Sequence, residues 1–398
     1  MIKKKTIQDI DIEGKTVLVR AEFNVTFRPG TTSISDDSRI MATAPTIRYL
    51  LDHDAKVVLC SHLGRPKGKV VPELRMTPIS QRLSQLLGQP VIQADDCVGA
   101  DVQARVEAMT VREILMLENL RFHPGEEEND PNFARELASL ADIYVNDAFG
   151  AAHRAHASIE GVTHYLPSVS GLLMARELEM LQGVLESPKQ PLVAIIGGAK
   201  VSDKLLVLEN LVGKVKTLIV GGGMAATFLK SQGLDVGDSL LEDDLIERAG
   251  EILRNADERG VQLLLPTDVI VADAFAEGAT SKVVQVSQIQ AGWRIMDIGP
   301  ETSAQYANAV SESGTVVWNG TMGVFEWDAF SNGTKRLAST LAGLNDAITV
   351  IGGGSTAEAI GTLGLAEKMT HVSTGGGASL EFLEGKELPG VASLLDAE

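Results

Sequence analysis

The chain has 398 residues, which at about 150 residues per domain predicts two or three domains. Its 35 Lys and Arg against 53 Asp and Glu give a formal net charge of −18. This charge argues against nucleic acid or an anionic membrane as a partner, because both attract cationic faces. The composition, 44% hydrophobic and 22% charged, is that of a globular protein. No apolar stretch of signal-peptide length follows the basic N-terminus, and no stretch approaches the length of a transmembrane helix. The two cysteines form no C-x-x-C pair, so we expect no thiolate metal site and a reducing cytoplasm.

Ten short apolar runs rich in β-branched residues predict buried strands. They lie at 17–20, 56–60, 114–117, 143–145, 192–196, 217–220, 261–265, 315–317, 349–351 and 370–372. Segments with helical spacing separate them, and this alternation indicates parallel α/β sheets. Because ten strands exceed one comfortable doubly wound sheet, we expect an α/β protein with two Rossmann-like, doubly wound parallel-sheet domains.

A helical stripe lies between the two groups of strands. Met174, Leu178, Leu181 and Leu185 recur at i, i+4, i+7 and i+11, the spacing of one helix face. The sequence Ser-Pro-Lys-Gln-Pro at 187–191 then ends the helix. We interpret it as a hinge helix between two domains; an ordinary core helix followed by a loop is the alternative.

Polar and basic residues follow the strands of the first half. In open α/β sheets, ligands bind at the carboxyl ends of the strands, and the fork of arginine suits carboxylate and phosphate oxygens. The residues concerned are Glu22, Asn24, His62, Arg65, Arg121 and Arg154, with Arg39 in the polar stretch 36–39. This pattern indicates a pocket for a small polyanion; ordinary surface salt bridges are the alternative.

Glycines follow the strands of the second half instead, at 197–198, 221–223, 352–354 and 375–377. Glycine lets backbone N–H groups approach phosphates, and the helix that follows favours negative charge. Lys200 and Lys204 are four residues apart, so both would lie on one helix face if a helix starts near Ser202. The pattern indicates a nucleotide site; tight strand-to-helix turns are the alternative.

Other catalytic classes leave weaker signals. Residues 221–226 and 352–357 fit G-x-G-x-x-A, but the first is not followed at about 20 positions by the strand-end acid of a dinucleotide site. The sequence has no P-loop, no H-R-D catalytic loop and no G-x-S-x-G nucleophile elbow. His153 and His156 could suggest a metal pair, but no third ligand has zinc-like spacing and Arg154 would repel a cation.

Six longer segments carry a recognisable pattern. They read SHLGRPKG at 61–68, ENLRF at 118–122, VNDAFGAAHRAH at 145–156, GGAKVSDK at 197–204, WNGTMGVFE at 318–326 and STGGGASLE at 373–381. In these segments the chain resembles the phosphoglycerate kinases, and the resemblance runs essentially from end to end.

The resemblance implies a two-lobed, cytoplasmic monomer. Its N-terminal phosphoglycerate-binding domain would span 1–168, with the tail 382–398 folding back onto it, and its nucleotide-binding domain would span 169–381. The implied reaction is the reversible transfer of the acyl phosphate of 1,3-bisphosphoglycerate to Mg-ADP, giving 3-phosphoglycerate and ATP in glycolysis or gluconeogenesis. Transfer would be direct and in line after domain closure, by positioning and electrostatic stabilisation. Hinge residues at 166–170 would then affect turnover without touching substrate.

The resemblance also implies roles for individual residues. Phosphoglycerate would be held by Glu22, Asn24, Arg39, His62, Arg65, Arg121 and Arg154. The nucleotide would be held by Gly198, Ala199, Lys200, Lys204, Ile295, Asn319, Glu326, Gly352, Gly353, Gly354, Ser355 and Thr356. Catalysis would rest on Arg39, Lys200, Gly375 and Gly376, with the glycine amides leading into a helix that opens at Ser379.

Four positions depart from the family pattern. Glu22 and Ser355 replace aspartates, Thr321 replaces a proline, and Ile295 replaces a small residue near the adenine. Ser355 offers nucleotide-bound Mg²⁺ only a neutral oxygen, although Mg²⁺ usually keeps waters and phosphate ligands. Because every implied arginine and lysine and His62 remain, we expect an active kinase; the alternative is a catalytically impaired phosphoglycerate- or nucleotide-binding protein of the same fold.

Overall fold

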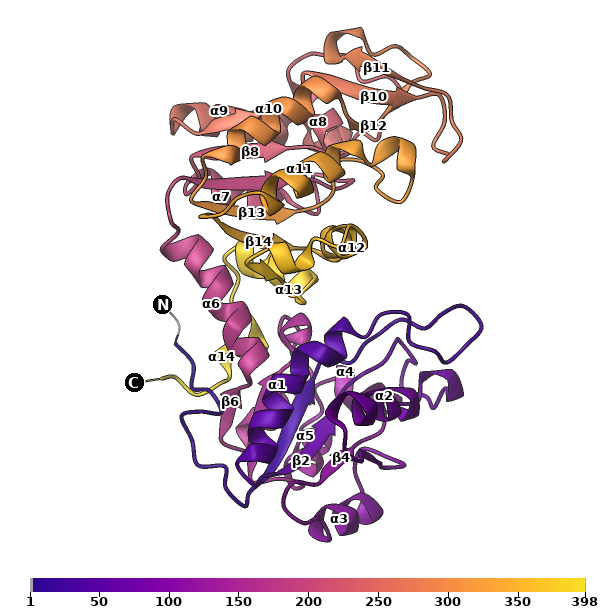
Figure 1. The fold of residues 1–398 in the computed structure, drawn as a ribbon, viewed down its shortest axis with the longest axis vertical. Helices are drawn as coiled ribbons and strands as arrows, with labels where there is room; N and C mark the ends of the chain where they lie inside the picture. The colour runs from indigo at the N-terminus through magenta and orange to yellow at the C-terminus, as the bar shows by residue number, and fades with distance from the viewer. Residues whose placement is uncertain (1–2, 398) are drawn as a thin grey trace. The chain divides into compact units, whose positions relative to one another are not determined.

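The computed structural model describes residues 3–397, and Figure 1 labels many of the helices and strands. The chain forms two compact units. Unit 1 comprises Met1–Glu179 with Glu387–Glu398, and unit 2 comprises Met180–Lys386. The division falls inside helix α6 (Leu172–Glu186), whereas the division that we predict from the sequence precedes this helix.

Unit 1 is built on a six-stranded sheet in the order β3-β4-β2-β1-β5-β6, with every pair parallel. Its strands are β1 (Thr16–Ala21), β2 (Lys56–Cys60), β3 (Ile92–Gln93), β4 (Ile114–Met116), β5 (Ile143–Asp147) and β6 (Ser168–Ser170). Its helices are α1 (Ser38–Asp52), α2 (Thr77–Leu87), α3 (Ala100–Glu107), α4 (Pro124–Glu127), α5 (Pro131–Ala138) and α14 (Pro389–Ala392). Short 3-10 helices are Pro72–Leu74, Leu120–Phe122, Phe149–Ala151 and Gly161–His164.

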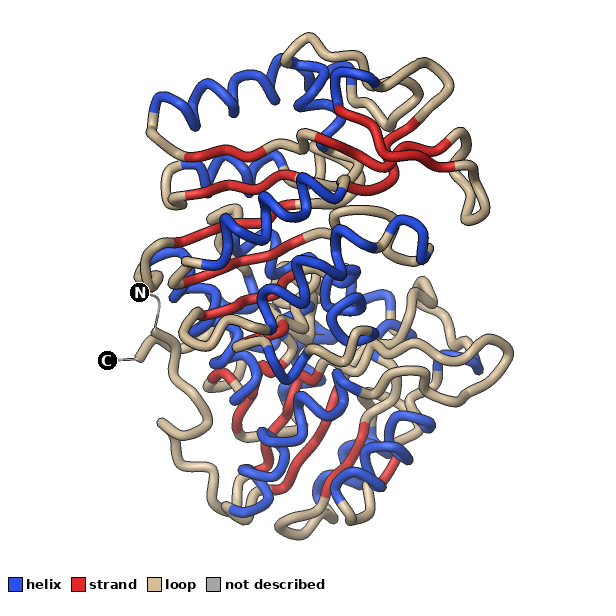
Figure 2. Tube along the Cα trace, turned by 45° about the horizontal axis from the view of Figure 1, so that its top comes forward, coloured by secondary structure: helices blue, strands red, loops and turns tan. Residues whose placement is uncertain are grey.

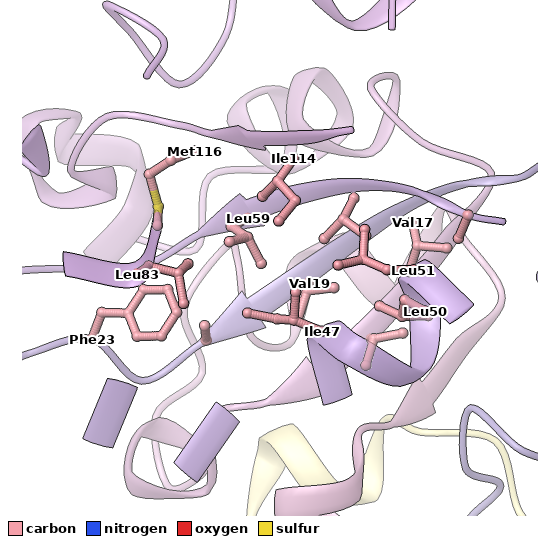
Figure 3. Close-up of a cluster of buried hydrophobic side chains, with 14 of the residues drawn as sticks. Val17, Val19, Phe23, Ile47, Leu50, Leu51, Leu59, Leu83, Ile114 and Met116 are labelled. Carbon is pink, nitrogen blue, oxygen red and sulfur yellow. The ribbon is translucent and has the colours of Figure 1, made fainter. Parts of the chain in front are cut away.

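The core of unit 1 lies between this sheet and its helices. In Figure 3, Val17 and Val19 of β1 and Leu59 of β2 lie close to Ile47 and Leu50 of α1, and all five are fully buried. Valine and leucine side chains of this kind each contribute roughly 1.5–3 kcal/mol when fully buried. The β-branched sequence of β1 therefore favours both the strand and its place at the centre of the sheet.

The segment 387–397 packs on the rest of unit 1. Lys5 N donates to Leu395 O at 2.8 Å, Leu395 N donates to Ser168 O at 2.9 Å, and Gly390 N donates to Ala152 O at 2.8 Å. The apolar side chains of this segment that become buried are Leu388, Val391 and Leu394. The segment thus supplies both backbone pairing and core surface to unit 1.

Unit 2 contains a second six-stranded parallel sheet, ordered β15-β14-β13-β7-β8-β9. Its strands are β7 (Leu192–Ile196), β8 (Thr217–Val220), β9 (Gln262–Leu264), β13 (Thr315–Asn319), β14 (Ile348–Gly352) and β15 (His371–Val372). The helices of unit 2 after α6 are α7 (Leu205–Val212), α8 (Ala225–Ser231), α9 (Ile246–Glu258), α10 (Pro300–Ser311), α11 (Asn332–Ala342), α12 (Gly354–Thr362) and α13 (Gly377–Leu383). Short 3-10 helices are Asp243–Leu245, Val286–Gln288, Asp328–Phe330 and Ala366–Lys368. Figure 2 shows helices packed around the strands of each unit, as in a doubly wound fold.

The predicted α/β class with two parallel sheets is confirmed, and each of the ten predicted runs contains a strand. The short edge strands β3 and β6 were not predicted. A small antiparallel sheet in unit 2, ordered β11-β10-β12, was not predicted either. It consists of β10 (Asp268–Ala272), β11 (Ser281–Gln285) and β12 (Arg294–Ile298). The apolar run of β10 carries a usable strand signal, but most side chains of β11 are exposed and show no buried pattern.

Across residues 3–397, none of the helices combines the length and hydropathy that crossing a lipid bilayer requires.

Candidate active site

The order of the unit 1 sheet brings the predicted basic residues to one edge. The chain enters at β1, adds β2, β4 and β3 on one side, and adds β5 and β6 on the other. The direction therefore changes between β1 and β5, and ligands of open α/β sheets bind at the carboxyl ends of the strands at such a point. Glu22 follows β1, His62 follows β2, and Arg154 follows β5.

Three arginines lie around His62 together with His156, whose own pKa is lowered to about 4 by burial and by the same arginines. Burial holds the pKa of His62 well below its usual range, and the nearby Arg20, Arg121, Arg154 and His156 lower it further. The His62 side chain is 4% exposed, so water does little to offset them. The imidazole is therefore neutral in the physiological range. The cluster can attract an anion, but His62 contributes to it without a charge of its own.

Arg121 is the buried arginine of the predicted set. Its Nη1 donates to Gly64 O at 2.8 Å, and its Nε lies 3.3 Å from the Glu127 carboxylate. Burial lowers the pKa of Arg121, with further lowering by Arg154 and Arg20 against the raising effect of Glu127. Arginine remains protonated even after such a shift, so Arg121 is a fixed positive charge beside His62.

Arg39 lies at the start of α1 and is anchored to the loop after β1. Its Nη1 donates to Asn24 O at 2.9 Å and lies 3.4 Å from Glu22 Oε1. The side chain of Glu22 is 4% exposed against 38% for Arg39. Among the described residues, Glu22 Oε2 is buried without a hydrogen-bond partner. One nitrogen of the guanidinium is thus held, and the half-exposed remainder can meet a ligand.

The remaining residues of the predicted substrate set have different surroundings. Asn24 Oδ1 accepts a hydrogen bond from Gly64 N at 2.9 Å, which ties the loop after β1 to the loop after β2. Arg154 is half-buried, and its Nε donates to His153 Nε2 at 3.3 Å. Arg65 is exposed.

Sequence reasoning missed two members of the cluster, Arg20 and His156. Arg20 had a usable signal, because a charged residue inside an apolar strand buried on both faces must have partners. His156 was considered only as a metal ligand.

In unit 2 the corresponding change of direction lies between β7 and β13. The chain starts at β7, adds β8 and β9 on one side, and then adds β13, β14 and β15 on the other. Gly197 and Gly198 follow β7, while Asn319 ends β13 and Gly320 follows it. This is the point at which doubly wound sheets bind nucleotides.

The glycines of unit 2 fall into two groups. A Cβ at Gly197, Gly222 or Gly320 would overlap backbone oxygens of a neighbouring loop. These three glycines therefore let the loops after β7, β8 and β13 pack against one another. For them the alternative interpretation, tight strand-to-helix turns, holds. A Cβ at Gly354 or Gly376 would meet nothing within 4 Å. The backbone at these two positions is accessible, as a phosphate-binding loop requires.

Lys200 and Lys204 do not share a helix face, because no helix starts near Ser202. Residues 201–204 form turns and α7 begins only at Leu205. The cause is Glu242, which accepts hydrogen bonds from Ser202 N at 3.1 Å and from Ser202 Oγ at 2.5 Å. Lys200 is exposed in the loop, and Lys204 precedes the first helical residue.

Lys204 is the half-buried lysine. Its Nζ donates to Asn319 Oδ1, and burial lowers its pKa to about 8, although Asp203 and Glu384 oppose this. Within residues 3–397, Asn319 Nδ2 is buried without a hydrogen-bond partner. An ammonium group and an unpaired amide N–H therefore occur together at the end of β13.

Further predicted nucleotide residues lie at the start of α12. Ser355 is exposed in its first turn, while Thr356 is buried and accepts a hydrogen bond from Gly320 N at 2.7 Å. Thr356 therefore ties the loops together, whereas the Ser355 hydroxyl is accessible. The helix predicted to open at Ser379 begins instead at Gly377.

Glu326 and Ile295 differ in accessibility. Glu326 is exposed. Ile295 is 9% exposed and packs in a cluster with Ala226, Leu229 and Val236. The larger side chain at this position therefore fills a buried space under α8.

The donors of unit 2 fit a phosphate-bearing ligand better than they fit a metal held by protein alone. Gly354 and Gly376 offer open backbone, and Ser355 offers one neutral oxygen, which suits an Mg²⁺ held mainly by phosphates and water. In unit 1 the ligand atoms of Asp96, Cys97 and His123 lie within 4.8 Å of one another. Asp96 pairs with His123 at 2.5 Å and Cys97 Sγ donates to the Glu118 carbonyl at 3.0 Å, so these groups already have partners.

Comparison with known proteins agrees with this arrangement. The family model described as phosphoglycerate kinase matches residues 7–386. The phosphoglycerate kinase of Moorella thermoacetica is 55% identical over 393 residues, and that of Pelotomaculum thermopropionicum is 56% identical over 393 residues, each match covering 99% of both chains. The solved phosphoglycerate kinase of Coxiella burnetii superposes with a TM-score of 0.87 at 42% identity, covering 98% of both chains. That of Pyrococcus horikoshii OT3 gives 0.83 at 32% identity, covering 99% of this chain and 98% of the other. The chain therefore belongs to the phosphoglycerate kinase family and is a phosphotransferase.

Proposed function

We propose that the basic cluster of unit 1 holds phosphoglycerate and that the glycine loops of unit 2 hold the Mg-nucleotide. The acyl phosphate of 1,3-bisphosphoglycerate then passes directly to ADP, giving 3-phosphoglycerate and ATP, and the reaction is reversible. One observation carries the proposal: a chain of net charge −18 gathers Arg20, Arg121 and Arg154 around a neutral His62 at the strand ends of one sheet. Such a concentration of fixed positive charge suits a small polyanion.

The reaction needs no proton transfer from the protein. The bond between the phosphorus and the carboxylate oxygen breaks, and a β-phosphate oxygen of ADP forms the new bond to phosphorus. The attacking phosphate oxygen is already an anion and the carboxylate leaves as an anion, so neither requires a proton transfer, and a neutral His62 is compatible with this chemistry. What the transition state requires is stabilisation of negative charge on the equatorial oxygens.

Two side chains are proposed for that task. Arg39 is held through Nη1 by Asn24 O and Glu22, which leaves the other side of its fork for the phosphoryl group. Lys200 is exposed in the loop after β7 and can follow the nucleotide phosphates. The accessible backbone at Gly376, with its neighbour Gly375, is proposed to add N–H donors. Mg²⁺ bound with the nucleotide would neutralise further phosphate charge, with Ser355 as a minor protein ligand.

The location of the two sets in different units has a consequence for the mechanism. Direct transfer requires the bound substrates to meet, so we propose that the units close on each other and exclude water during transfer. Each unit has its own sheet, and the described cysteines are buried free thiols. We propose a cytoplasmic monomer that uses no nucleic-acid or membrane partner.

The test is turnover with 3-phosphoglycerate, Mg²⁺ and ATP, coupled through glyceraldehyde-phosphate dehydrogenase to the loss of NADH. Arg39→Ala and Lys200→Ala should each lower kcat by about a hundredfold or more, the usual effect of removing a donor to developing charge. Normal turnover in both variants would contradict the assigned roles. Absence of turnover in the unmodified protein, with 3-phosphoglycerate still bound, would instead favour the impaired binding protein.

A further inference from the structure

Arg20 is a fully buried charge next to the last residue of β1. It is 1% exposed and uses all three nitrogens of its guanidinium. Nε donates to Ser158 Oγ at 2.9 Å, Nη1 donates to Ala21 O at 2.5 Å, and Nη2 lies 2.9 Å from His62 Nδ1. A planar fork with three acceptors in fixed positions has little freedom to move.

The charge of Arg20 is balanced through a serine. Ser158 Oγ donates to Glu126 Oε1 at 2.6 Å, and Ser158 N donates to Glu126 Oε2 at 2.9 Å. Glu126 is completely buried and Ser158 is 1% exposed. Arg20, Ser158 and Glu126 thus form a continuous chain of hydrogen bonds that connects a buried positive charge with a buried negative one.

The contact with His62 has only one chemical interpretation. A guanidinium carries five N–H donors and no acceptor. His62 Nδ1 must therefore accept from Arg20, and a neutral ring that accepts at Nδ1 carries its proton on Nε2. The tautomer of His62 follows from the partner that the fold provides.

The groups around His62 also determine its charge state. Arg20 reaches it from β1, Arg121 from the 3-10 helix Leu120–Phe122 after β4, and Arg154 and His156 from the segment after β5. Burial and these four groups all disfavour the imidazolium. The ring is accordingly neutral as well as fixed in its tautomer.

We propose that Arg20 is a positioning residue that holds His62 as a neutral donor, with its Nε2–H presented to an anionic oxygen of phosphoglycerate. The inference rests on the proposed function only in the identity of that anion. A fixed neutral donor recognises an oxygen acceptor independently of pH, and it disfavours a ligand that offers another donor at that point. Arg20 thereby acts on substrate recognition through His62.

The first test observes the unmodified protein and uses one substitution only to assign the signal. In the full chain labelled with ¹⁵N-histidine, a two-bond ¹H–¹⁵N correlation spectrum distinguishes the two tautomers, and His62→Asn assigns the signal. We expect His62 to show an unprotonated Nδ1 and a protonated Nε2, unchanged between pH 5.5 and 8. A protonated Nδ1, a mixture of tautomers or titration of the ring in this range would overturn the proposal.

The second test separates positioning from general electrostatics. Arg20→Met removes the donor, and pairing it with Glu126→Gln avoids an uncompensated buried carboxylate; Glu126→Gln alone is the control and should keep the His62 tautomer. Adding Arg20→Met in that background should let His62 populate both neutral tautomers. It should also raise the KM for 3-phosphoglycerate about tenfold, as expected for one hydrogen bond. The KM for the nucleotide should stay unchanged.

A double-mutant cycle completes the test. His62→Asn keeps an acceptor near the Nδ1 position and removes the Nε2 donor. If Arg20 acts through His62, Arg20→Met should raise the KM for 3-phosphoglycerate far less when His62→Asn is already present. An equal rise in both backgrounds would overturn the positioning role. A fixed tautomer combined with an unchanged KM in His62→Asn would instead overturn the placement of phosphoglycerate at His62.

Discussion

At the scale of single residues, the site depends on carboxylates and amides that hold its cations in place. Glu22 is an example, because its buried carboxylate contacts Arg39 at 3.4 Å while its second oxygen has no hydrogen-bond partner among the described residues. Burying a carboxylate costs desolvation free energy, so we expect Glu22 to orient its neighbour Arg39 rather than to stabilise the fold.

Glu22→Gln should therefore lower kcat/KM for 3-phosphoglycerate about tenfold, because the amide keeps the shape but loses the charge-assisted contact with Arg39. Steady-state kinetics would measure the effect. The matched control is Asp37→Asn, which removes the nearby carboxylate that pairs with Arg82 at 2.6 Å. The control should change kcat/KM by about twofold or less, as is usual for ion pairs near the protein surface. Equal effects of the two substitutions would contradict an orienting role for Glu22.

We expect Lys204 to give the proposed nucleotide site a pH dependence. Its pKa is lowered to about 8 by burial, so the free protein loses this positive charge as the pH rises through about 8. The affinity for Mg-ADP should then fall between pH 7 and pH 9, and binding near pH 8.5 should take up a proton. Calorimetry in buffers of different ionisation enthalpy measures both quantities. Lys204→Arg, which stays charged, should make the affinity for Mg-ADP nearly independent of pH. An affinity independent of pH in the unmodified protein would contradict a role for the Lys204 charge.

At the scale of secondary-structure elements, three buried aspartates begin three helices. Asp147 accepts from Leu173 N and Met174 N at the start of α6, at 2.9 and 3.2 Å. Asp268 accepts from Thr302 N of α10 at 2.7 Å, and Asp297 accepts from Gly333 N of α11 at 2.9 Å. A carboxylate in this position satisfies N–H groups that have no partner within the helix.

Each of these aspartates also lies against a glycine. A Cβ at Gly171 would overlap the Asp147 carboxylate, one at Gly299 would overlap Asp268, and one at Gly323 would lie 2.5 Å from Asp297 Oδ1. These glycines provide space for a carboxylate rather than conformational freedom. The sequence shows them only as glycines, which is why composition does not reveal their purpose.

Gly171→Ala should destabilise the protein by roughly 1–3 kcal/mol, because the new methyl group displaces the Asp147 carboxylate from the start of α6. Gly183→Ala, inside α6 itself, is the control, since a Cβ there meets nothing within 4 Å. It should stabilise the protein by about 0.5–1 kcal/mol. Chemical denaturation of both variants gives the comparison. Similar shifts of the two midpoints would rule out this role for Gly171.

At the scale of the whole molecule, unit 1 is assembled from two distant parts of the chain. The segment 387–397 adds buried Leu388, Val391 and Leu394 and pairs its backbone with residues near both Lys5 and Ser168. Asn146 Nδ2 of β5 also donates to Gly390 O at 3.0 Å.

Truncation after Lys386 should therefore weaken unit 1 by several kcal/mol, the sum of three lost apolar side chains at roughly 1.5–3 kcal/mol each. Unit 2 contains none of the deleted residues, so its affinity for Mg-ADP should change little. Hydrogen exchange followed by mass spectrometry would locate the loss of protection, and calorimetry would measure the nucleotide. Loss of protection in β7, β8 and β13 to the same extent as in β1 and β5 would contradict the claim that this segment stabilises unit 1 alone.

Sequence reasoning reached the parts of this protein that local pattern determines. Strands such as β2 and β7 are apolar on both faces, so short β-branched runs identified them with the correct bounds. The antiparallel sheet was not predicted because most side chains of its edge strand β11 are exposed, so this strand has no apolar run. A helix starting near Ser202, the condition for Lys200 and Lys204 to share a face, is not formed; Ser202 lies in a turn and donates to Glu242, which is distant in sequence.

The candidate site shows the same limit. Strand ends and the family resemblance pointed to Arg39, Arg121 and Lys204, because a residue after a parallel strand has a predictable place. Which glycines pack against a loop and which remain open depends on contacts between separate loops. The partnership of Arg20 with His62 and Glu126 likewise joins three segments that no local pattern connects.

The packing of residues 387–397 on unit 1 also has a consequence for folding during synthesis on the ribosome. Residues up to Glu179 emerge first, but their partner segment is made only after all of unit 2 has been translated. At roughly 5–20 residues per second this interval lasts on the order of ten to forty seconds. During it, the apolar surface that later receives Leu388, Val391 and Leu394 stays uncovered. The nascent first unit is thus a substrate for chaperones for longer than its own length would require, and the second unit can mature before it.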